Sequence, residues 1–328
     1  MRIDVHAHLI PESVFDVLPD TTRLTFGLPA SDGRTQPPNQ GGSFEALQLY
    51  DIGRRLRDME DQMVDMQVLS VPPGPMFFSR LPEAEAVAAC RRVNDAFAET
   101  VSADREHFAA IATVPVQSPQ AAAAELERAV RDLGLRGCEI NSNVNGANLD
   151  DKALAPFYAR AQALDVPIFI HPAGVPGLGE RLGSYYLGNL IGNPMDTTIA
   201  AASLIFGGVF AEFPRLKVYL AHGGGACPYI LGRWEHGWHV RGEGKANINR
   251  PPSEYFRSLY FDSLVHSGSA LSFLASTVGP ERVMLGTDYP FDMGNYNSVK
   301  AIEGVGGVTD AGKEMMLGGN AATLFGIW

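Results

Sequence analysis

Short runs of strand-forming residues alternate with longer segments of helical periodicity along almost the whole sequence. We expect eight strands, at residues 3–6, 64–70, 109–114, 137–141, 167–171, 217–221, 259–262 and 283–287. We expect amphipathic helices at residues 51–62, 83–104, 118–133, 150–164, 194–212, 228–240, 267–277 and 309–324. Such alternation builds parallel sheets, and eight strand–helix units are what a barrel needs to close. The pattern therefore predicts an α/β fold, a (β/α)8 TIM barrel, with residues 1–328 as a single domain.

An open, doubly wound sheet is the structural alternative to this barrel. It would not normally need eight strand–helix units. In addition, no G-x-G-x-x-G motif follows the first predicted strand. Both observations favour the closed barrel.

Residues 9–50 interrupt the alternation of strands and helices. They are rich in proline and glycine and include GRTQPPNQGG at 33–42. A loop of this length in a compact domain is usually functional or disordered. Because it follows the first strand, it would lie over the mouth of the barrel, and we predict that it is a lid insertion.

Composition and charge exclude several classes of protein. Hydrophobic residues make up 45% of the 328 residues, which is enough for a large core, and the formal net charge is −11. An acidic surface disfavours nucleic acid and anionic membranes as partners. The longest apolar stretch, at 199–210, is too short to span a bilayer. Three cysteines far apart (Cys90, Cys138 and Cys227) and a start without a signal-like segment predict a cytoplasmic protein.

Histidine and aspartate residues stand where several predicted strands end. His6 and His8 are two positions apart in the first strand, so both imidazoles can point to the same side. His171, His222 and Asp288 follow the apolar runs of the fifth, sixth and eighth strands. Because the carboxyl ends of barrel strands meet at one face, we expect these side chains to lie together there. The spacing predicts a metal site rather than unrelated structural histidines.

The donor types indicate which ion the site would hold. Three imidazoles and one carboxylate (His6, His8, His171 and Asp288) suit Zn²⁺ first, with Fe²⁺, Mn²⁺ or Co²⁺ as alternatives. A metal of this kind lowers the pKa of its bound water towards neutrality. His222 precedes Gly223-Gly224-Gly225, so we assign it to acid–base chemistry on that water, with a role as a fourth nitrogen ligand as the alternative.

One metal ion is favoured over two. A binuclear site usually needs a bridging anion, and the fourth predicted strand, GCEIN, has no lysine that could be modified to supply one. Glu139 in that strand could bridge in principle, but an ordinary paired carboxylate is the more frequent role for such a residue.

Motifs spread over the whole chain carry a family resemblance. They are DVHAHLIP, VDMQVLS, FIHPAG, LAHGGGACPYILGR, PPSEYF, RVMLGTDYPF and the terminal GNAATLFG. With them, the sequence resembles the amidohydrolase-related family that includes 2-amino-3-carboxymuconate-6-semialdehyde decarboxylase. The resemblance implies that His6, His8, His171 and Asp288 are metal ligands and that His222 acts on the metal-bound water. The H-x-H motif places the chain nearer to this type than to benzoate-type decarboxylases, which typically have Glu at the first position.

The resemblance also implies substrate-binding residues. Arg233 matches an arginine that the family contributes across a dimer interface, which implies a homodimer, and Arg241 matches another basic residue near the site. Tyr185 stands where the decarboxylase has a tryptophan. The lid arginine has no clear counterpart, and Arg34 is the nearest candidate. The alternative for Arg233 and Arg241 is a place in solvated or structural ion pairs. From its position after Asp288-Tyr289-Pro290, Phe291 is expected to wall the pocket.

Three functions are compatible with this site. The first is a metal-dependent, non-oxidative decarboxylase, a C–C lyase acting on a small unsaturated or aromatic carboxylate, with metal-bound water and His222 as acid–base groups. The second is a hydrolase or hydratase that uses the same site on an amide, lactone or vinylogous C–C bond, with Asp288 taking the proton. The third is a non-catalytic barrel in which the metal is only structural.

Overall fold

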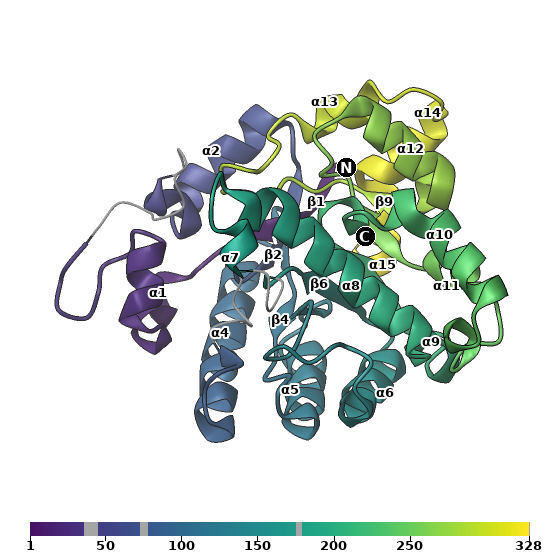
Figure 1. Ribbon diagram of the computed structural model, residues 1–328. Helices are drawn as coiled ribbons and strands as arrows, with labels where there is room; N and C mark the ends of the chain where they lie inside the picture. The colour runs from purple at the N-terminus through teal and green to yellow at the C-terminus, as the bar shows by residue number, and fades with distance from the viewer. Residues whose placement is uncertain (36–44, 73–77, 175–178, 328) are drawn as a thin grey trace.

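The barrel is built from parallel strands in the order of the sequence (Figure 1). The computed structural model describes residues 1–35, 45–72, 78–174 and 179–327. The strands are β1 (Ile3–His8), β2 (Met66–Ser70), β3 (Phe108–Ala110), β4 (Ala112–Thr113), β5 (Cys138–Asn141), β6 (Pro167–His171), β7 (Lys217–Leu220), β8 (Tyr260–Asp262) and β9 (Val283–Met284). The third predicted strand is divided at Ile111 into β3 and β4, so these nine segments form the eight staves of a barrel.

Backbone hydrogen bonds close the two sheets into one ring. Strands β1 to β3 form one parallel sheet and β4 to β9 the other. At the first seam, Ile111 N donates to Leu69 O at 2.9 Å. At the second seam, Val5 N donates to Leu285 O at 2.9 Å, and Ala7 forms a parallel bridge with Tyr289. The predicted (β/α)8 barrel is therefore confirmed.

The last stave is irregular beyond its first two residues, although we predicted a strand to residue 287. The chain leaves regular geometry after β9 but still bonds to β1, because Asp288 N donates to His6 O at 2.8 Å. Asp288 itself has a left-handed backbone, with φ at 59°. This departure turns its side chain towards the two histidines of β1.

Helices surround the strands, with α4, α5 and α6 along one side of the barrel in Figure 1. The predicted helices are present, three of them divided into shorter segments, and short unpredicted turns occur beside them. The α-helices are α1 (Asp20–Thr25), α2 (Ile52–Gln62), α4 (Glu83–Ala103), α5 (Pro119–Arg131), α6 (Ala155–Leu164), α7 (Gly179–Leu182), α8 (Asn193–Phe206), α9 (Val209–Glu212), α10 (Cys227–Val240), α11 (Pro252–Phe256), α12 (Gly268–Val278), α13 (Ser298–Glu303), α14 (Asp310–Glu314) and α15 (Asn320–Phe325). No helix in the described ranges is long and apolar enough to cross a membrane.

Two apolar clusters hold the helices to the strands. The larger one fills the layer between barrel and helices and includes the fully buried Phe97, Phe157 and Phe256. The smaller one ties the C-terminal helix α15 to the strands: Tyr219 stacks on Phe169 with ring centroids 4.3 Å apart, and its ring meets that of Phe325 edge-on at 5.7 Å. Rigid packing of this kind fixes the strand ends that carry the polar residues.

The segment predicted to be a lid is described only in part. It contains the 3-10 turns η1 (Glu12–Val17) and η2 (Ala46–Leu49) and helix α1. Leu9, Ile10 and Val14 are buried in the larger cluster, which anchors the start of the segment. Residues 36–44, which hold most of the proline- and glycine-rich tract, lie outside the described residues. The lid assignment therefore stays a prediction.

Candidate metal centre

Four side chains from three separate parts of the chain meet at the carboxyl ends of the strands. His6 and His8 come from β1, His171 is the last residue of β6, and Asp288 follows β9. All four are buried, and each offers one ligand atom that lies within 4.8 Å of the other three. Asp288 Oδ1 lies 3.3 Å from His6 Nε2 and 3.2 Å from His8 Nε2. The structure thus brings together the complete set of predicted ligands.

The bonding of the imidazoles fits a bound cation. In the described part of the chain, His6 Nε2, His8 Nε2 and Asp288 Oδ1 are buried and have no hydrogen-bond partner. Buried polar atoms without partners are costly unless something binds them. The opposite nitrogen of each imidazole is engaged, which is how metal-binding histidines are usually oriented. The Nδ1 contacts are His6 to Asp262 Oδ2 at 2.7 Å, His8 to Ser70 Oγ at 3.1 Å, and His171 to Pro172 O at 3.1 Å.

The electrostatics of the four residues favour a positive ion between them. Burial lowers the pKa of His8 to about 4 and that of His171 well below its usual value, so both offer neutral lone pairs at neutral pH. Burial alone would lower the pKa of His6, but Asp288 and Asp262 outweigh it and raise it to about 10. Burial would likewise raise the pKa of Asp288, but the charge of His6 and the close approach of the imidazoles to its carboxylate hold it well below its usual range. A divalent metal would displace the proton of His6 on binding.

Glu139 of β5 is not a fifth member of this group. Burial raises its pKa to about 8, with the nearby Ser70 hydroxyl opposing the shift in part. Neither carboxylate oxygen has a regular hydrogen bond within the described residues, so Glu139 is not the ordinary paired carboxylate that we expected. A carboxyl group that is mostly protonated at neutral pH is a poor bridging ligand. The donor set therefore supports one divalent metal ion per chain.

His222 lies beside the four ligands but outside their cluster. It follows β7, and its Nε2 is 3.6 Å from Asp288 Oδ2. Its ring centroid is 5.4 Å from that of His6 and 5.6 Å from that of His171. Unlike the three other imidazoles, it is partly exposed, with 17% of its side chain accessible. An imidazole next to a metal centre and open to a cavity can exchange protons with a substrate.

Asp262 supports both the ligand His6 and the backbone of His222, and we did not identify it from the sequence. Its carboxylate accepts hydrogen bonds from His6 Nδ1 (2.7 Å), His222 N (2.9 Å), Gly223 N (2.7 Å) and Leu264 N (3.1 Å). These donors hold the carboxylate charged in spite of full burial, because they lower its pKa. The available signal was its place at the end of the predicted strand 259–262, where an acid follows an apolar run.

Replacing Asp262 by Asn is expected to weaken metal binding by about 10–100-fold, the usual effect of losing a partner that orients a metal-binding histidine. All four groups that bond to Asp262 are donors, and each carboxylate oxygen accepts from two of them, so two donors would face the amide NH2 instead of an oxygen. The measurement is the metal dissociation constant by competition with a chelating dye. Asp61→Asn, a change on the exposed surface of α2, is the matched control, and equal affinity of the two variants would contradict the proposed role.

Three glycines allow the backbone after His222 to pass close to its neighbours. Gly223, Gly224 and Gly225 all have positive φ, at 61°, 76° and 63°. A Cβ on Gly225 would lie only 2.0 Å from Pro194 O, at the start of α8. The backbone after His222 thus passes close to the start of α8, and this contact fixes the position of His222 relative to α8.

Gly225→Ala is expected to destabilise the fold by about 2–4 kcal/mol, because it adds a left-handed alanine to a site with no space for its methyl group. Gly53→Ala is the matched control. Its Cβ would make only van der Waals contacts, at 3.4 Å from Asp51 Oδ1 and 3.7 Å from an Arg57 nitrogen. In the helix α2 it should be neutral or stabilise by up to about 1 kcal/mol. Urea denaturation of both variants gives the comparison, and equal stabilities would show that the glycine run is not constrained.

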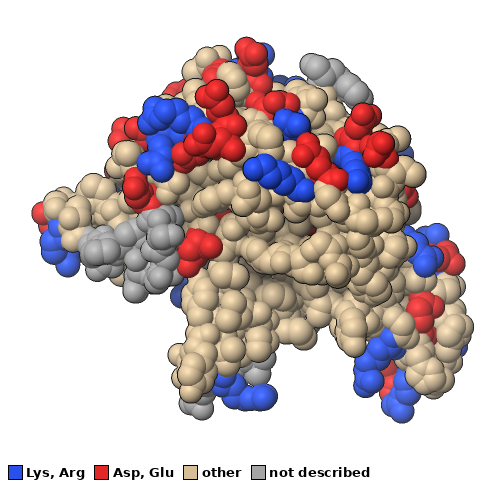
Figure 2. Space-filling view, turned by 90° about the horizontal axis from the view of Figure 1, so that it is seen from above, with Lys and Arg blue, Asp and Glu red and all other residues tan. Residues whose placement is uncertain are grey.

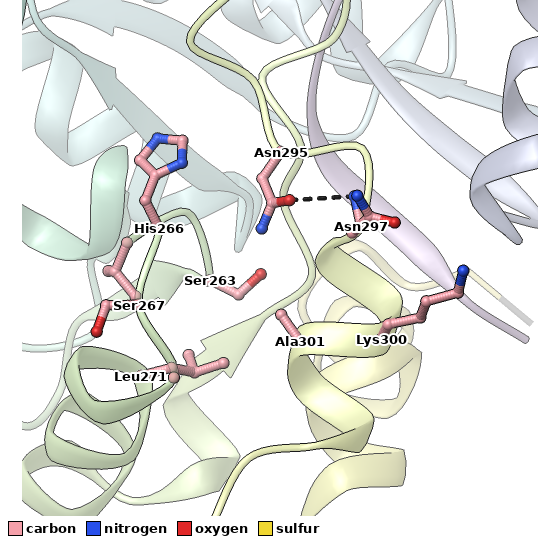
Figure 3. A pocket seen from close by; sticks show the side chains of 10 residues that line it. Ser263, His266, Ser267, Leu271, Asn295, Asn297, Lys300 and Ala301 are labelled. Atoms are coloured by element: carbon pink, nitrogen blue, oxygen red, sulfur yellow. Dashed lines mark hydrogen bonds between the residues drawn. The ribbon is translucent and has the colours of Figure 1, made fainter.

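A cavity of about 380 Å³ opens next to His222. The π-helical turn η4 (Gly188–Gly192), the start of α8 and residues 264–266 form its walls. A second cavity of about 360 Å³ adjoins it, and Val265 and His266 line both. Figure 3 shows the second cavity, in which the Lys300 side chain points away from Ser263 and His266. Of these two cavities, the first is lined by His222 and the second is not, so the first is the better candidate for the substrate pocket.

The predicted substrate-binding residues are not all at this cavity. Phe291 is buried beside the metal centre, with its ring centroid 5.4 Å from that of His8. Arg233 lies exposed on α10, and Tyr185 is 87% exposed. The exposed Arg241 pairs with Glu243 at 2.8 Å, which is the alternative that we considered for it. Of these four residues, only Phe291 therefore lies at the metal centre of its own chain.

Comparisons of the sequence with known proteins agree with the fold and the metal-site geometry described above. The amidohydrolase family model matches residues 3–327. The 2-amino-3-carboxymuconate-6-semialdehyde decarboxylase of Dictyostelium discoideum is 39% identical over 335 residues, covering 100% of this chain and 92% of that protein. The 2-keto-4-carboxy-3-hexenedioate hydratase of Sphingobium is 30% identical over 305 residues, covering 88% of this chain and 83% of that protein.

A solved structure shows the same fold with a metal in place. The dihydroxybenzoic acid decarboxylase of Polaromonas, with bound manganese and the inhibitor 2-nitroresorcinol, matches with a TM-score of 0.84 at 27% identity and covers 99% of this chain and 97% of that chain. Sequence motifs, barrel and buried ligand set therefore lead to the same conclusion: the chain belongs to the amidohydrolase family.

Proposed function

We propose that this protein is a metal-dependent carboxy-lyase that removes CO2, without oxidation, from a small aromatic or unsaturated carboxylate. The observation that carries the proposal is the buried His6, His8, His171 and Asp288 cluster, with His222 between it and a cavity. The full-length similarity to a decarboxylase supports it. The partial exposure of His222 also argues against a purely structural metal, which would need no imidazole open to a cavity.

The arrangement assigns a role to each group in the reaction. A bound divalent ion would hold the substrate oxygens and lower the pKa of bound water. His222 gives a proton to the carbon that carries the carboxylate. The bond between this carbon and the carboxylate then breaks, its electron pair returns to the unsaturated system, and CO2 leaves. His222 regains a proton from water, so one proton replaces one CO2. Asp288 stays ionised and orients the His222 imidazole through its Oδ2.

A panel of phenolic and unsaturated carboxylates tests this proposal. The products are identified by mass spectrometry, with loss of CO2 expected. The second candidate function is a hydratase, which the 30% identical relative favours, and it would instead yield a product that has gained one water. No reaction with any carboxylate, but turnover of lactones or amides, would identify a hydrolase and overturn the proposal.

The identity of the metal is part of the proposal. The donor set suits Zn²⁺, as we expected, but the similar Polaromonas structure contains manganese. We therefore propose one divalent transition-metal ion per chain, Zn²⁺ or Mn²⁺. Elemental analysis of the purified protein, together with activity after reloading with each metal in turn, distinguishes the two.

Exposed apolar side chains support a homodimer. Ile191, Met195 and Ile199 form a stripe at four-residue spacing on η4 and α8, and each is at least 36% exposed. Tyr229 on α10 is 85% exposed, one helical turn before Arg233. The middle of the lower half of Figure 2 also shows an area free of charged side chains, between charged groups at the lower left and the lower right. We propose that a second copy covers this face and that Arg233 reaches the partner's active site.

A charge placed on this face is expected to separate the two copies. Tyr229→Glu should convert the protein into a monomer in sedimentation velocity and lower its activity, because burying an unpaired carboxylate in an interface is costly. Phe273→Glu, on the 46% exposed Phe273 of α12, is the matched control and should leave the dimer intact. A wild-type monomer, or equal behaviour of both variants, would contradict the dimer.

Two broader assignments complete the proposal. We propose that residues 1–328 act as one catalytic unit, with residues 9–50 as a lid over the cavity.

We also propose a cytoplasmic location, which the three free and buried cysteines support. Burial raises the pKa of Cys227 to about 12, so this thiol, close behind the glycine run, is not a nucleophile.

A further inference from the structure

The metal ligand His171 differs from His6 in the group that its Nδ1 contacts. The Nδ1 of His6 bonds to the carboxylate of Asp262, whereas the Nδ1 of His171 lies 3.1 Å from the main-chain oxygen of Pro172. A carbonyl oxygen can only accept a hydrogen bond, so Nδ1 of His171 carries the proton and Nε2 has the free lone pair. The direction of this imidazole therefore depends on the peptide group that contains Pro172 O.

The N–H of the same peptide group donates to a carboxylate on α8. Pro172 O and Ala173 N belong to one planar unit, so a bond that fixes the N–H also fixes the oxygen. Ala173 N donates to Asp196 Oδ2 at 2.9 Å and to Ser142 Oγ at 3.0 Å. A single peptide plane thus connects the carboxylate of Asp196 with the imidazole of His171.

Ser142, the residue after β5, ties the neighbouring peptide group to the same carboxylate. Its hydroxyl donates to Asp196 Oδ2, and its backbone N donates to His171 O at 2.9 Å. Asn143 Nδ2 lies 3.4 Å from the other carboxylate oxygen, Asp196 Oδ1. The two successive peptide groups that follow His171 are therefore both held, one through Ser142 and the other through Asp196 itself.

The burial of Asp196 indicates that it does more than pack α8 against the barrel. Its exposed fraction is 2%, and that of Ser142 is 1%. Burying a carboxylate is costly unless its oxygens are bonded, and apolar side chains could hold a helix to the strands at a lower cost. All the groups that bond to Asp196 are donors next to the strand ends, and two of them fix the backbone after a metal ligand.

We propose that Asp196 is a positioning residue of the metal centre, which sets the direction of the His171 imidazole through the peptide group between Pro172 and Ala173. Partners that orient metal-binding histidines are usually bonded to the ring itself, as Asp262 is to His6. Here the carboxylate acts one peptide group away. The proposal rests on the metal-binding part of the proposed function, the role of His171 as a ligand, and not on the reaction that follows.

Two substitutions of Asp196 separate its hydrogen bonds from its charge. Asp196→Ala removes the acceptor of both Ser142 and Ala173, and it should raise the metal dissociation constant by about 10–100-fold. It should also change the visible absorption spectrum of the Co²⁺-loaded protein, which reports the coordination geometry. Both donors bond to Oδ2, so the single oxygen of Asn can accept from both. Asp196→Asn should therefore retain the wild-type affinity and spectrum.

Asn94→Ala is the matched control for a purely structural effect. Asn94 of α4 is fully buried, and its amide donates to Thr113 O at 3.0 Å and accepts from Thr113 N at 2.9 Å. It therefore also ties a helix to the backbone at a strand end, but β4 carries no metal ligand. Asn94→Ala should lower Tm and leave the metal affinity and the Co²⁺ spectrum unchanged. If Asp196→Ala does not fold, Asp196→Ser takes its place, because its hydroxyl reaches less far than the carboxylate.

The outcomes distinguish this inference from the proposed reaction. Wild-type affinity and spectrum in Asp196→Ala or its Ser replacement would overturn the inference. So would an equal loss of metal affinity in Asn94→Ala, or an Asp196→Asn variant as impaired as Asp196→Ala. If the wild type binds no metal, the metal centre and the inference are both wrong. The expected metal affinities without CO2 release from any carboxylate would support the inference and count against the carboxy-lyase.

Discussion

Replacing His222 by Ala is expected to lower the rate of CO2 release by about 10²–10⁴-fold, the usual contribution of a positioned acid–base group. His222 is the one imidazole of the centre that borders the cavity, and it lies outside the cluster of four ligands. The variant should therefore retain its metal and its fold while it loses the proton donor. The measurement is kcat under saturating substrate, with metal content determined on the same sample.

The control for this experiment is a histidine at the other end of the barrel. His107 precedes β3 and pairs with Asp104 at 2.9 Å, far from the carboxyl ends of the strands. His107→Ala should have wild-type activity. If His222→Ala loses metal together with activity, His222 is a ligand, which is the alternative role that we considered for it. If its activity is unchanged, the assignment of the proton donor is wrong.

Replacing Asp288 by Asn is expected to abolish activity and to weaken metal binding by at least about 100-fold, more than the loss of an outer partner would. Asp288 supplies the only carboxylate of the ligand cluster, and its Oδ1 lies within 3.3 Å of two imidazole nitrogens. An amide has the same shape but no charge to offset that of a divalent ion. It also loses the contact that orients His222.

Thermal unfolding shows the loss of metal directly. A ligand that binds only the folded state at 100 times its dissociation constant stabilises that state by about 2.7 kcal/mol. Adding Mn²⁺ or Zn²⁺ to the metal-free wild type should raise Tm, and the same addition should leave Asp288→Asn unchanged. Asp292→Asn, four residues along the same loop and exposed, should respond like the wild type. A full metal response in Asp288→Asn would contradict the ligand assignment.

The barrel and the centre could be predicted because both follow from where strands end. Apolar runs defined the strands, and polar residues directly after these runs, such as His171 and Asp288, had to meet at one face of the barrel. The division of the third strand at Ile111 could not be foreseen, since Ala109, Ile111 and Ala112 are equally compatible with a continuous strand.

Contacts that depend on tertiary packing could not be predicted from the sequence. Asp262 has the same local signature as any acid at a strand end, and only the fold shows that it bonds to His6 and to the backbone of His222. The position of Arg241 was predicted by resemblance alone, whereas in the structure it is exposed and pairs with its neighbour Glu243.

The most direct test of the carboxy-lyase is the reaction of a substrate carboxylate, identified in the panel, in deuterated water. The metal-loaded protein is mixed with acid labelled with ¹³C at the carboxyl group, and the gas and the product are analysed by mass spectrometry. The proposed reaction predicts one labelled CO2 for each substrate consumed and one deuterium at the carbon that it left, both lost in His222→Ala. Consumption of substrate with the labelled carbon still in the product would contradict decarboxylation and identify a hydratase or hydrolase instead.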